Sequence, residues 1–403
     1  MTIPHLLHVL PTFVPAGLEM RTVNLIAGFG SELRHSILSL DGRTDAAARL
    51  PPDAPVRLLP SPPKAGSLRT VARLRALLKR ERPDLVLTYN WGAFDMLLAA
   101  RSLGFRQVIH HEDGFDADEA RAFKRRRVLA RRAVLRGVPS LVVPSSRLRS
   151  IATELWKMPE ERVLLIPNGL DLRAYTPADT DPDRPSAARH PALRRELGIP
   201  LDALVVGTVG HLRPEKNFLR LLDACAAIDA PGTDVHVLIV GEGGERAALE
   251  ARAARPDLAG RVHLAGYQPD PPRFYRAMDV FALSSDTEQM PVCLLEAMGS
   301  HLPVATTDVG DIRAVLPVEQ APYLVPLGPI PGEAATAGAL ARALGELARD
   351  RDTCRRLGRL NRSRVESNFS FAAMLSAYRN AYQEVMRMRS CAPREAIESA
   401  VLK

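Results

Sequence analysis

Short apolar runs alternate with helical patterns along the whole chain. The runs are rich in leucine and β-branched residues. They occupy residues 5–10, 36–40, 85–89, 107–111 and 141–144, and then residues 204–209, 235–240, 261–265, 280–284, 304–306 and 323–325. Strands that are separated by crossover helices form a parallel sheet with helices on both faces. The alternation therefore predicts an α/β fold built from doubly wound sheets.

A segment dense in proline, aspartate and alanine separates the two series of runs. A chain of 403 residues is also longer than one hydrophobic core usually organises. We therefore predict two tandem Rossmann-like domains, residues 1–175 and 192–370, joined by a linker over residues 176–191. A last helical stretch, residues 371–390, could pack back on the first domain.

The composition, 46% hydrophobic and 25% charged residues, is typical of a soluble globular protein. The four cysteines lie far apart and form no Cys-x-x-Cys pair, so neither disulfides nor a metal cluster is expected. No basic leader precedes the first apolar residues, and no stretch is apolar for long enough to cross a bilayer. These features predict a cytoplasmic protein without a metal site.

The net charge of +8 indicates an anionic partner, and part of the excess is concentrated in one segment. Residues 121–136 contain eight basic residues and no acidic one, with apolar residues at helical spacing. One interpretation is a helix that lies on the anionic inner face of a membrane. The other is a solvated helix whose apolar side packs on its own domain. Nucleic acid is not expected, because no aromatic residues alternate with the arginines to stack bases.

Glycines and charged residues gather directly after the predicted strands. Doubly wound sheets bind ligands beyond the carboxyl ends of their strands. The segments at these ends are residues 11–19, 110–115, 210–217, 241–244, 284–296 and 308–310. Each segment is a weak signal alone, and their joint position predicts a ligand site.

The segment 288–296 carries two glutamates, eight positions apart. Pro291 suits the first turn of a helix, so Glu288 is placed in a loop and Glu296 in the second helical turn. The N–H groups of this helix should begin near Met290. They can hold phosphate oxygens, while the carboxylates accept hydrogen bonds from sugar and ribose hydroxyls. The alternative is a capped surface helix with two solvated glutamates.

In this order, these segments resemble the retaining glycosyltransferases of family 4, part of the group 1 glycosyltransferases with the GT-B fold. The resemblance covers nearly the whole chain and is most specific over residues 206–310. It implies two Rossmann-like domains that face each other across a cleft. It also implies transfer of a sugar from a UDP- or GDP-linked donor, with retention of anomeric configuration and without a metal ion or other cofactor.

The resemblance implies a role for each matching residue. Glu296 would hold the ribose hydroxyls and Glu288 would contact the donor sugar. Lys216 would neutralise the leaving phosphates, and His110 would lie beside the reacting sugar. The other residues expected at the donor are Gly17, Gly210, Gly241, Met290, Pro291 and Val292.

Two positions depart from the family pattern. His211 stands where the family usually has arginine, so we expect Arg213 to act with Lys216, or His211 to carry charge only when protonated. Ala16 precedes Gly17 where two glycines are common, and its methyl group narrows access to the backbone.

Two other functions fit the same segments. A sugar-nucleotide epimerase of the same fold would change the donor without an acceptor. A non-catalytic nucleotide-sugar-binding protein would explain His211. The acceptor is inferred only by analogy, as a lipid-linked saccharide or growing polysaccharide at the cell surface.

Overall fold

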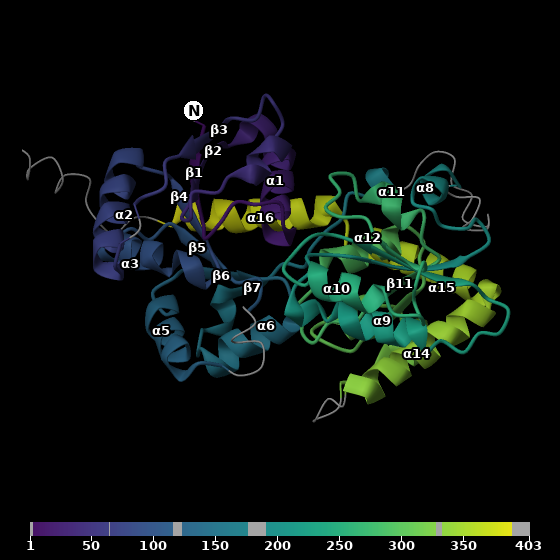
Figure 1. Ribbon diagram of the computed structural model, residues 1–403. Helices are drawn as coiled ribbons and strands as arrows, with labels where there is room; N and C mark the ends of the chain where they lie inside the picture. Colours follow the sequence, from purple (N-terminus) through teal and green to yellow (C-terminus); the bar gives the residue numbers. More distant parts are fainter. Residues whose placement is uncertain (1–2, 64, 116–122, 176–190, 328–332, 389–403) are drawn as a thin grey trace, which may run out of the picture. The chain divides into compact units, whose positions relative to one another are not determined.

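The computed structural model describes residues 3–63, 65–115, 123–175, 191–327 and 333–388, and these form an α/β fold with two parallel sheets (Figure 1). Contacts divide the chain into two compact units. The first unit is Met1–Pro167 together with Ala373–Lys403, and the second is Asn168–Ala372. The division falls before the predicted boundary at residue 175. All of the predicted linker except Pro191 lies outside the described residues.

The sheet of the first unit has seven strands in the order β3-β2-β1-β4-β5-β6-β7, and neighbouring strands run parallel. The strands are β1 (His5–Leu10), β2 (Arg34–Ser39), β3 (Val56–Leu59), β4 (Leu85–Tyr89), β5 (Val108–His111), β6 (Ser140–Val143) and β7 (Val163–Leu165). The strand order reverses between β1 and β4, which is where a doubly wound sheet opens a crevice for ligands.

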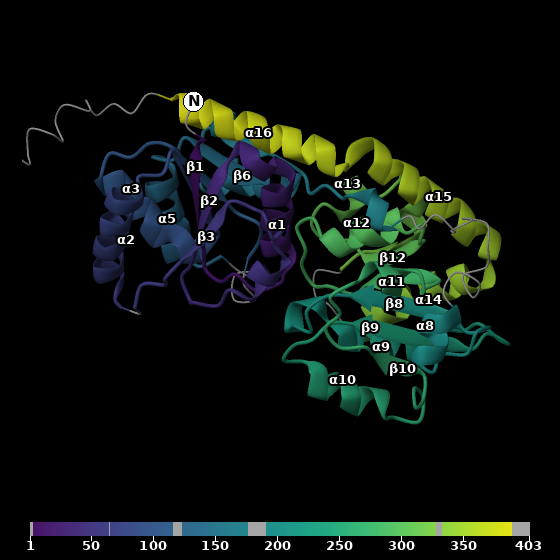
Figure 2. The same ribbon diagram turned by 90° about the horizontal axis from the view of Figure 1, so that it is seen from above.

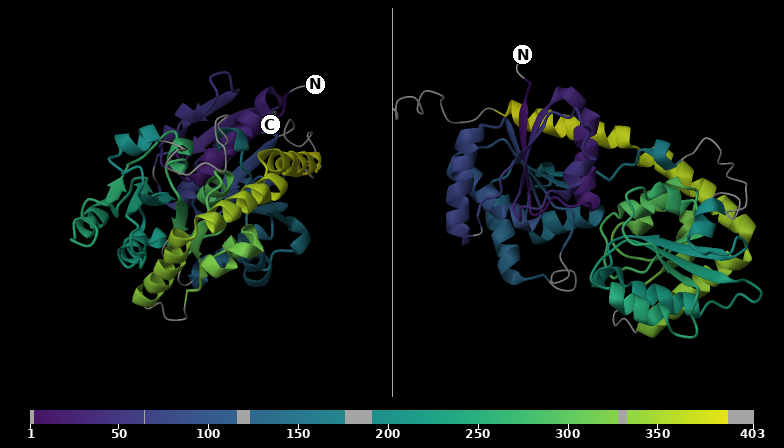
Figure 3. Two further views of the ribbon diagram at one scale, coloured as in Figure 1. Left: turned by 90° about the vertical axis from the view of Figure 1, so that its right-hand side faces the viewer. Right: turned by 45° about the horizontal axis from the view of Figure 1, so that its top comes forward.

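Helices cover both faces of this sheet (Figure 3). They are α1 (Gly17–Phe29), α2 (Ser67–Glu81), α3 (Phe94–Ser102), α5 (Arg125–Leu135), α6 (Ser146–Ser150) and α16 (Phe371–Arg387). Single-turn segments are η1 (Gly30–Glu32), η2 (Asp45–Arg49), η3 (Trp91–Ala93), η4 (Ile151–Leu155) and η5 (Glu160–Arg162). On one face, Leu7 and Val9 of β1 join a core with Leu77 of α2 and Leu97 of α3.

The opposite face of the sheet carries a group of buried polar side chains among apolar ones, and α16 runs along it (Figure 2). His8 Nδ1 lies 2.9 Å from Tyr89 Oη, and His8 Nε2 lies 3.0 Å from His35 Nδ1. His111 stacks between Tyr89 and Tyr378 of α16, with ring centroids 4.5 and 5.9 Å away. Burial lowers the pKa of His35 to about 4, and it also lowers the pKa of His8 and of His111 well below the ordinary value. These histidines are therefore neutral at neutral pH.

The sheet of the second unit has six strands in the order β10-β9-β8-β11-β12-β13, and its neighbouring strands are also parallel. The strands are β8 (Leu204–Val209), β9 (Val235–Val240), β10 (Val262–Leu264), β11 (Val280–Leu283), β12 (Val304–Thr307) and β13 (Leu324–Val325). The strand order reverses between β8 and β11.

Helices and short turns connect these strands. They are η6 (Leu172–Tyr175), α8 (Pro191–Glu196), η7 (Pro214–Lys216), α9 (Phe218–Ala226), α10 (Arg246–Ala253), α11 (Pro272–Tyr275), α12 (Val292–Gly299), α13 (Ile312–Val315), η8 (Val318–Tyr323), α14 (Glu333–Arg349) and α15 (Arg351–Asn368). Alternate residues of β8 point to opposite cores. Val205 packs with Leu295 of α12, and Val206 packs with Leu221 of α9 and Leu344 of α14.

In the parts of the chain that the structure describes, none of the helices has the length and apolar character needed to cross a membrane.

Candidate functional site

A lysine and a glutamate meet where the strand order of the second sheet reverses. Lys216 ends the short turn η7 that follows β8, and Glu288 lies in the loop that follows β11. Lys216 Nζ lies 2.6 Å from Glu288 Oε1, and only 21% and 9% of the two side chains are exposed. The structure therefore brings two predicted residues together at the position where this type of sheet binds ligands.

The charge of Lys216 depends on its partner. Burial alone would lower the pKa of the ammonium group, but the Glu288 carboxylate, with Cys293 and Glu215, raises the pKa above the ordinary value. Lys216 is therefore a fixed positive charge at neutral pH.

Hydrogen bonds hold the loop that carries Glu288. Ser285 Oγ donates to Glu288 Oε1 at 2.7 Å, and Thr307 Oγ1 donates to the Ser285 carbonyl at 2.6 Å. The buried Arg220 of α9 pairs with Asp286 at 2.7 Å and donates to the Ser284 carbonyl at 2.8 Å. The carboxylate is thus positioned by neighbours on three elements and does not project freely into solvent.

Gly310, in the loop after β12, allows a close approach to the Glu288 loop. Its φ of +60° lies in the left-handed region, and a Cβ there would overlap the carbonyl oxygens of Glu288 and Gln289. Asp311 N donates to the Gln289 carbonyl at 3.0 Å from the same loop. The predicted segment 308–310 therefore supports the site through its backbone.

Helix α12 begins directly after this loop, at Val292, with Pro291 at its N-cap. The expected start near Met290 was wrong by two residues, because Pro291 keeps an extended backbone with ψ of 126°. Asn168 Nδ2 donates to the Met290 carbonyl at 2.9 Å and fixes the entry to the helix. The first N–H groups of a helix lack partners within it and carry a partial positive charge.

Glu296 lies in the second turn of α12, as predicted, and both of its oxygens accept hydrogen bonds. Tyr175 Oη donates to Oε1 at 2.7 Å, and Tyr275 Oη donates to Oε2 at 2.6 Å. Burial raises the pKa of the Glu296 carboxyl, and the bonds from Tyr275 and Tyr175 oppose that rise. Sequence reasoning missed both tyrosines, because a buried tyrosine in an apolar pattern gives no signal beyond core packing.

The loops after β8 and β9 touch through their glycines. Gly241 has a φ of +149°, and a Cβ at this position would overlap the carbonyl oxygen of Gly210. A Cβ at Gly210 would meet only the Phe218 ring, at 3.7 Å. Of the two predicted glycines, Gly241 is therefore required for the close approach of the loops.

The two candidates for a second positive charge lie between Gly210 and Lys216. His211 is half-buried, and Arg213 is exposed, with its Nη1 3.8 Å from Glu215 Oε1. This Arg213–Glu215 distance is near the outer limit of an ion pair. The predicted action of Arg213 with Lys216 stays a prediction.

In the first unit, Gly17 is the first residue of α1, and Ala16 is its N-cap. Arg21, one turn further on, forms a two-pronged ion pair with Asp113 at 2.5 and 2.8 Å. Elsewhere in the described ranges, no three His, Cys, Asp or Glu side chains gather as a metal site.

The place of His110 beside the reacting sugar stays a prediction, and the structure shows how its ring is held. His110 is inside β5, its side chain is fully buried, and both ring nitrogens have partners. Nδ1 lies 2.8 Å from Thr88 Oγ1, and Nε2 lies 3.1 Å from Glu112 Oε2. The His110 ring therefore belongs to a buried polar network with Glu112 and Arg131, which are 2.9 Å apart.

The basic segment forms helix α5, with Arg121 outside the described residues. Val128, Val134 and Leu135 are buried in the core of the first unit, so the apolar side packs on its own domain. The outer side carries the exposed Arg125, Arg126 and Arg136 beside Leu129, which is 61% exposed.

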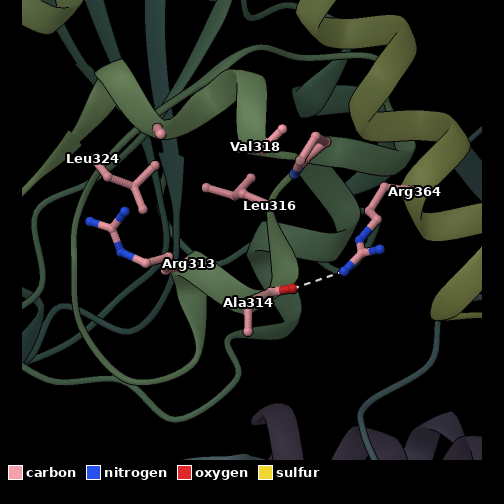
Figure 4. A pocket seen from close by; sticks show the side chains of 8 residues that line it. Arg313, Ala314, Leu316, Val318, Leu324 and Arg364 are labelled. Carbon is pink, nitrogen blue, oxygen red and sulfur yellow. Dashed lines mark hydrogen bonds between the residues drawn. The ribbon is translucent and has the colours of Figure 1, made fainter.

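A pocket of about 510 Å³ lies elsewhere on the second unit, between α13, η8 and α15 (Figure 4). Its walls are mainly apolar, and Arg313 and Arg364 lie on its sides. Arg313 pairs with Asp308, and Arg364 donates to the Ala314 and Val315 carbonyls. Both guanidinium groups are thus engaged by the protein itself. The pocket does not include Lys216, Glu288 or Glu296.

Two doubly wound parallel sheets in tandem are the architecture of the GT-B class of glycosyltransferase folds. HepE of Anabaena, solved in complex with UDP, superposes with a TM-score of 0.76 at 18% identity, covering 94% of this chain and 100% of that one.

Family matches agree with the fold. Residues 16–169 match the family of glycosyl transferase 4-like domains, and residues 203–350 match the family described as glycosyl transferases group 1. The chain therefore belongs to the group 1 glycosyltransferases.

Two curated relatives carry more specific names. The UDP-Gal:alpha-D-GlcNAc-diphosphoundecaprenol alpha-1,3-galactosyltransferase of Escherichia coli is 26% identical over 273 residues, which cover 65% of this chain and 67% of that protein. The putative glycosyltransferase EpsF of Bacillus subtilis (strain 168) is 32% identical over 151 residues, which cover 38% of this chain. That match spans only 37% of EpsF.

Proposed function

We propose that the chain is a retaining glycosyltransferase that moves a hexose from a UDP- or GDP-linked donor to an acceptor in cell-surface polysaccharide or glycolipid assembly. The observation that carries this proposal is the buried Lys216–Glu288 pair at the start of α12, where the second sheet changes strand order. The UDP bound to HepE and the UDP-Gal in the name of the E. coli relative support a nucleotide-sugar donor.

Lys216 would bind the diphosphate of a nucleotide-sugar donor, and Glu288 would bind its sugar. When the bond between the anomeric carbon and the diphosphate breaks, negative charge develops on the leaving oxygens. The Lys216 ammonium has three N–H donors, so it can bind phosphate oxygens beside Glu288. The N–H groups at the start of α12 add a second positive region. Groups that are already oriented stabilise such charge without further reorganisation.

Glu288 and Glu296 would then bind hydroxyls. Glu288 is held by Ser285 and Lys216, and it keeps acceptor capacity for a hydroxyl of the donor sugar. Glu296, in the second turn of α12, would accept from the ribose. In this proposal the protein supplies the positive charge itself, and neither a metal ion nor another cofactor is required.

The acceptor is proposed to be a lipid-linked saccharide at the inner face of the membrane. The name of the E. coli relative describes such an acceptor, a saccharide on diphosphoundecaprenol. The exposed Arg125, Arg126 and Arg136 on α5, with Leu129 between them, suit peripheral contact with an anionic membrane.

The test is transfer by the purified protein from a panel of UDP- and GDP-sugars to lipid-linked and free saccharides. Glu288→Gln should lower kcat/KM by about a hundredfold, as removal of one oriented polar group at a reacting centre commonly does. Glu346→Gln, on the exposed side of α14, is the matched control and should leave transfer unchanged. The anomeric configuration of the product, determined by NMR, tests retention.

Two results would favour the alternatives. Thermal stabilisation by nucleotide sugars without transfer to any acceptor would indicate a non-catalytic binding protein. Conversion of the sugar while no acceptor is present would indicate an epimerase.

A further inference from the structure

The Glu296 carboxylate is held by two tyrosines that come from different parts of the second unit. Tyr275 ends α11 and is fully buried, while Tyr175 ends η6 and is 9% exposed. Each hydroxyl donates to a different carboxylate oxygen, at 2.6 and 2.7 Å. Hydrogen bonds of this length to an ionised acceptor are among the stronger ones in proteins.

Packing fixes both rings. The Tyr175 and Tyr275 ring centroids lie 6.0 Å apart in an edge-to-face arrangement, and Phe281 packs on Tyr275 at 5.8 Å. Gly299, one turn after Glu296, lets the segment before Tyr175 lie against α12. A Cβ there would come within 2.9 Å of the Leu170 and Leu172 side chains. The tyrosines are therefore rigid supports and do not act as mobile surface groups.

The arrangement leaves half of the carboxylate's acceptor capacity for a ligand. A carboxylate has about four lone-pair directions, and the two tyrosines use one on each oxygen. One unused lone-pair direction remains on each oxygen of the Glu296 carboxylate. The carboxylate can therefore accept hydrogen bonds from two neighbouring hydroxyls at once. This matches a vicinal diol, the chemistry of the 2′ and 3′ hydroxyls of a ribose.

We propose that Tyr175 and Tyr275 are positioning residues, which orient Glu296 as the acceptor for the ribose diol of the nucleotide. The inference rests on the proposed function, because it presupposes a nucleotide ligand at α12. The tyrosines need not touch the ligand. Their effect is on the direction and ionisation of the carboxylate.

The ionisation of the Glu296 carboxyl allows a second test, the pH dependence of nucleotide binding. A protonated carboxyl loses acceptor capacity, and burial already raises the pKa of Glu296. Hydrogen bonds from the tyrosines stabilise the charged form, so removal of either hydroxyl should raise the pKa of Glu296 further. Affinity for the diol is lost as the pH falls through this pKa, and the loss should therefore start at a higher pH in Tyr→Phe variants.

The experiment measures binding of UDP and GDP, and of their 2′,3′-dideoxy analogues, by calorimetry between pH 5 and 8. The wild type should bind the better nucleotide roughly tenfold more tightly than its dideoxy analogue, about the worth of one hydrogen bond to a charged group. In Tyr275→Phe, and separately in Tyr175→Phe, this ratio should fall towards one. The acid limb of nucleotide binding should also move to higher pH.

Two controls separate positioning from a general effect. Tyr323→Phe, in η8 of the same unit, removes a tyrosine hydroxyl away from Glu296 and should keep the wild-type ratio. Glu296→Gln removes the charge itself and should abolish the ratio. If the Tyr→Phe variants bind nucleotide with the wild-type ratio and pH profile, the positioning role is wrong while the proposed function stands. If the wild type binds neither UDP nor GDP, the proposed function itself fails.

Discussion

At the scale of single residues, Arg194 shows how a charge can be placed in a core. Its side chain is fully buried, and it joins α8 to the segments that begin β8 and β11. Nη2 lies 2.8 Å from Asp279 Oδ2, while Nη1 and Nε donate to the Ala203 and Ala277 carbonyls at 3.0 and 3.1 Å. Arg351, which is 47% exposed, pairs with the other oxygen of Asp279.

Arg194→Met should lower the free energy of unfolding of the second unit by about 3–5 kcal/mol, because Asp279 loses its buried partner. Arg351→Ala is the matched control, since it removes the half-exposed partner of the same carboxylate and should cost less than about 1 kcal/mol. Both free energies are measured by unfolding in urea, with hydrogen exchange of the β8 and β11 amides as the readout for this unit. Equal losses of stability in the Arg194 and Arg351 variants would show that burial of the Arg194 partner does not matter to Asp279.

Sequence reasoning placed Lys216, Glu288 and Glu296 at strand ends and a helix start, where the structure has them. For His110 it predicted the strand, residues 107–111, that the structure has as β5, but it gave no sign that Thr88 and Glu112 hold the buried ring. It also missed Tyr175, whose contact with Glu296 joins residues 121 positions apart.

At the scale of elements, the central strands were predicted and two edge strands were not. β3 pairs only with β2, and its Arg57 and Leu58 are exposed; β7 has three residues and pairs only with β6. A central parallel strand is buried on both faces and shows as a continuous apolar run. β3 lacks that signal because it is largely exposed, and β7 because it has only three residues; the prolines around β3 hid it further.

Helix α5 should bind anionic membranes through its outer side. Arg125→Glu with Arg126→Glu should lower partitioning to vesicles of phosphatidylglycerol and phosphatidylcholine at least tenfold, since each basic residue near the surface contributes about 1 kcal/mol. Vesicle co-sedimentation measures this change. Arg69→Glu with Arg75→Glu on the exposed side of α2 changes the net charge equally and is the control. An equal loss in both variants would show that total charge, and not α5, governs the contact.

At the scale of the whole molecule, the first unit should lose stability in acid. His8, His35 and His111 are buried in it and have a lowered pKa, which for His35 is about 4. An unfolded chain has histidines with a pKa near 6.5 and binds more protons below that pH. The free energy of unfolding of the first unit should therefore fall as the pH drops from about 6.5 towards 4.

Hydrogen exchange in β1 and β4, compared at pH 7.5 and 5, tests this expectation. Their protection should decrease on acidification. His35→Asn removes one titrating group and should make the decrease smaller, although the variant is less stable at neutral pH because His8 loses a partner. Unchanged protection at pH 5 would contradict the assignment of neutral buried histidines.

The boundary between the units was predicted from composition, whereas the structure sets it by packing. Asn168 and Leu170 precede the proline-rich segment, yet they pair with Met290 and Phe369 of the second unit. Contacts of this kind join residues distant in sequence, so no local pattern reports them. The helical pattern of α16 was visible in the sequence, but its tyrosine contacts with the first sheet were not.

The return of helix α16 to the first sheet sets an order for biosynthesis. A ribosome makes residues 1–167 before the second unit, and α16, which covers the face that contains His8 and His111, is made only after that unit. While the second unit is being made this face stays uncovered, and partly folded chains with such surfaces are prone to aggregate. A premature stop codon after residue 370 would thus leave every candidate donor-site residue encoded, yet yield a product that depends on chaperones.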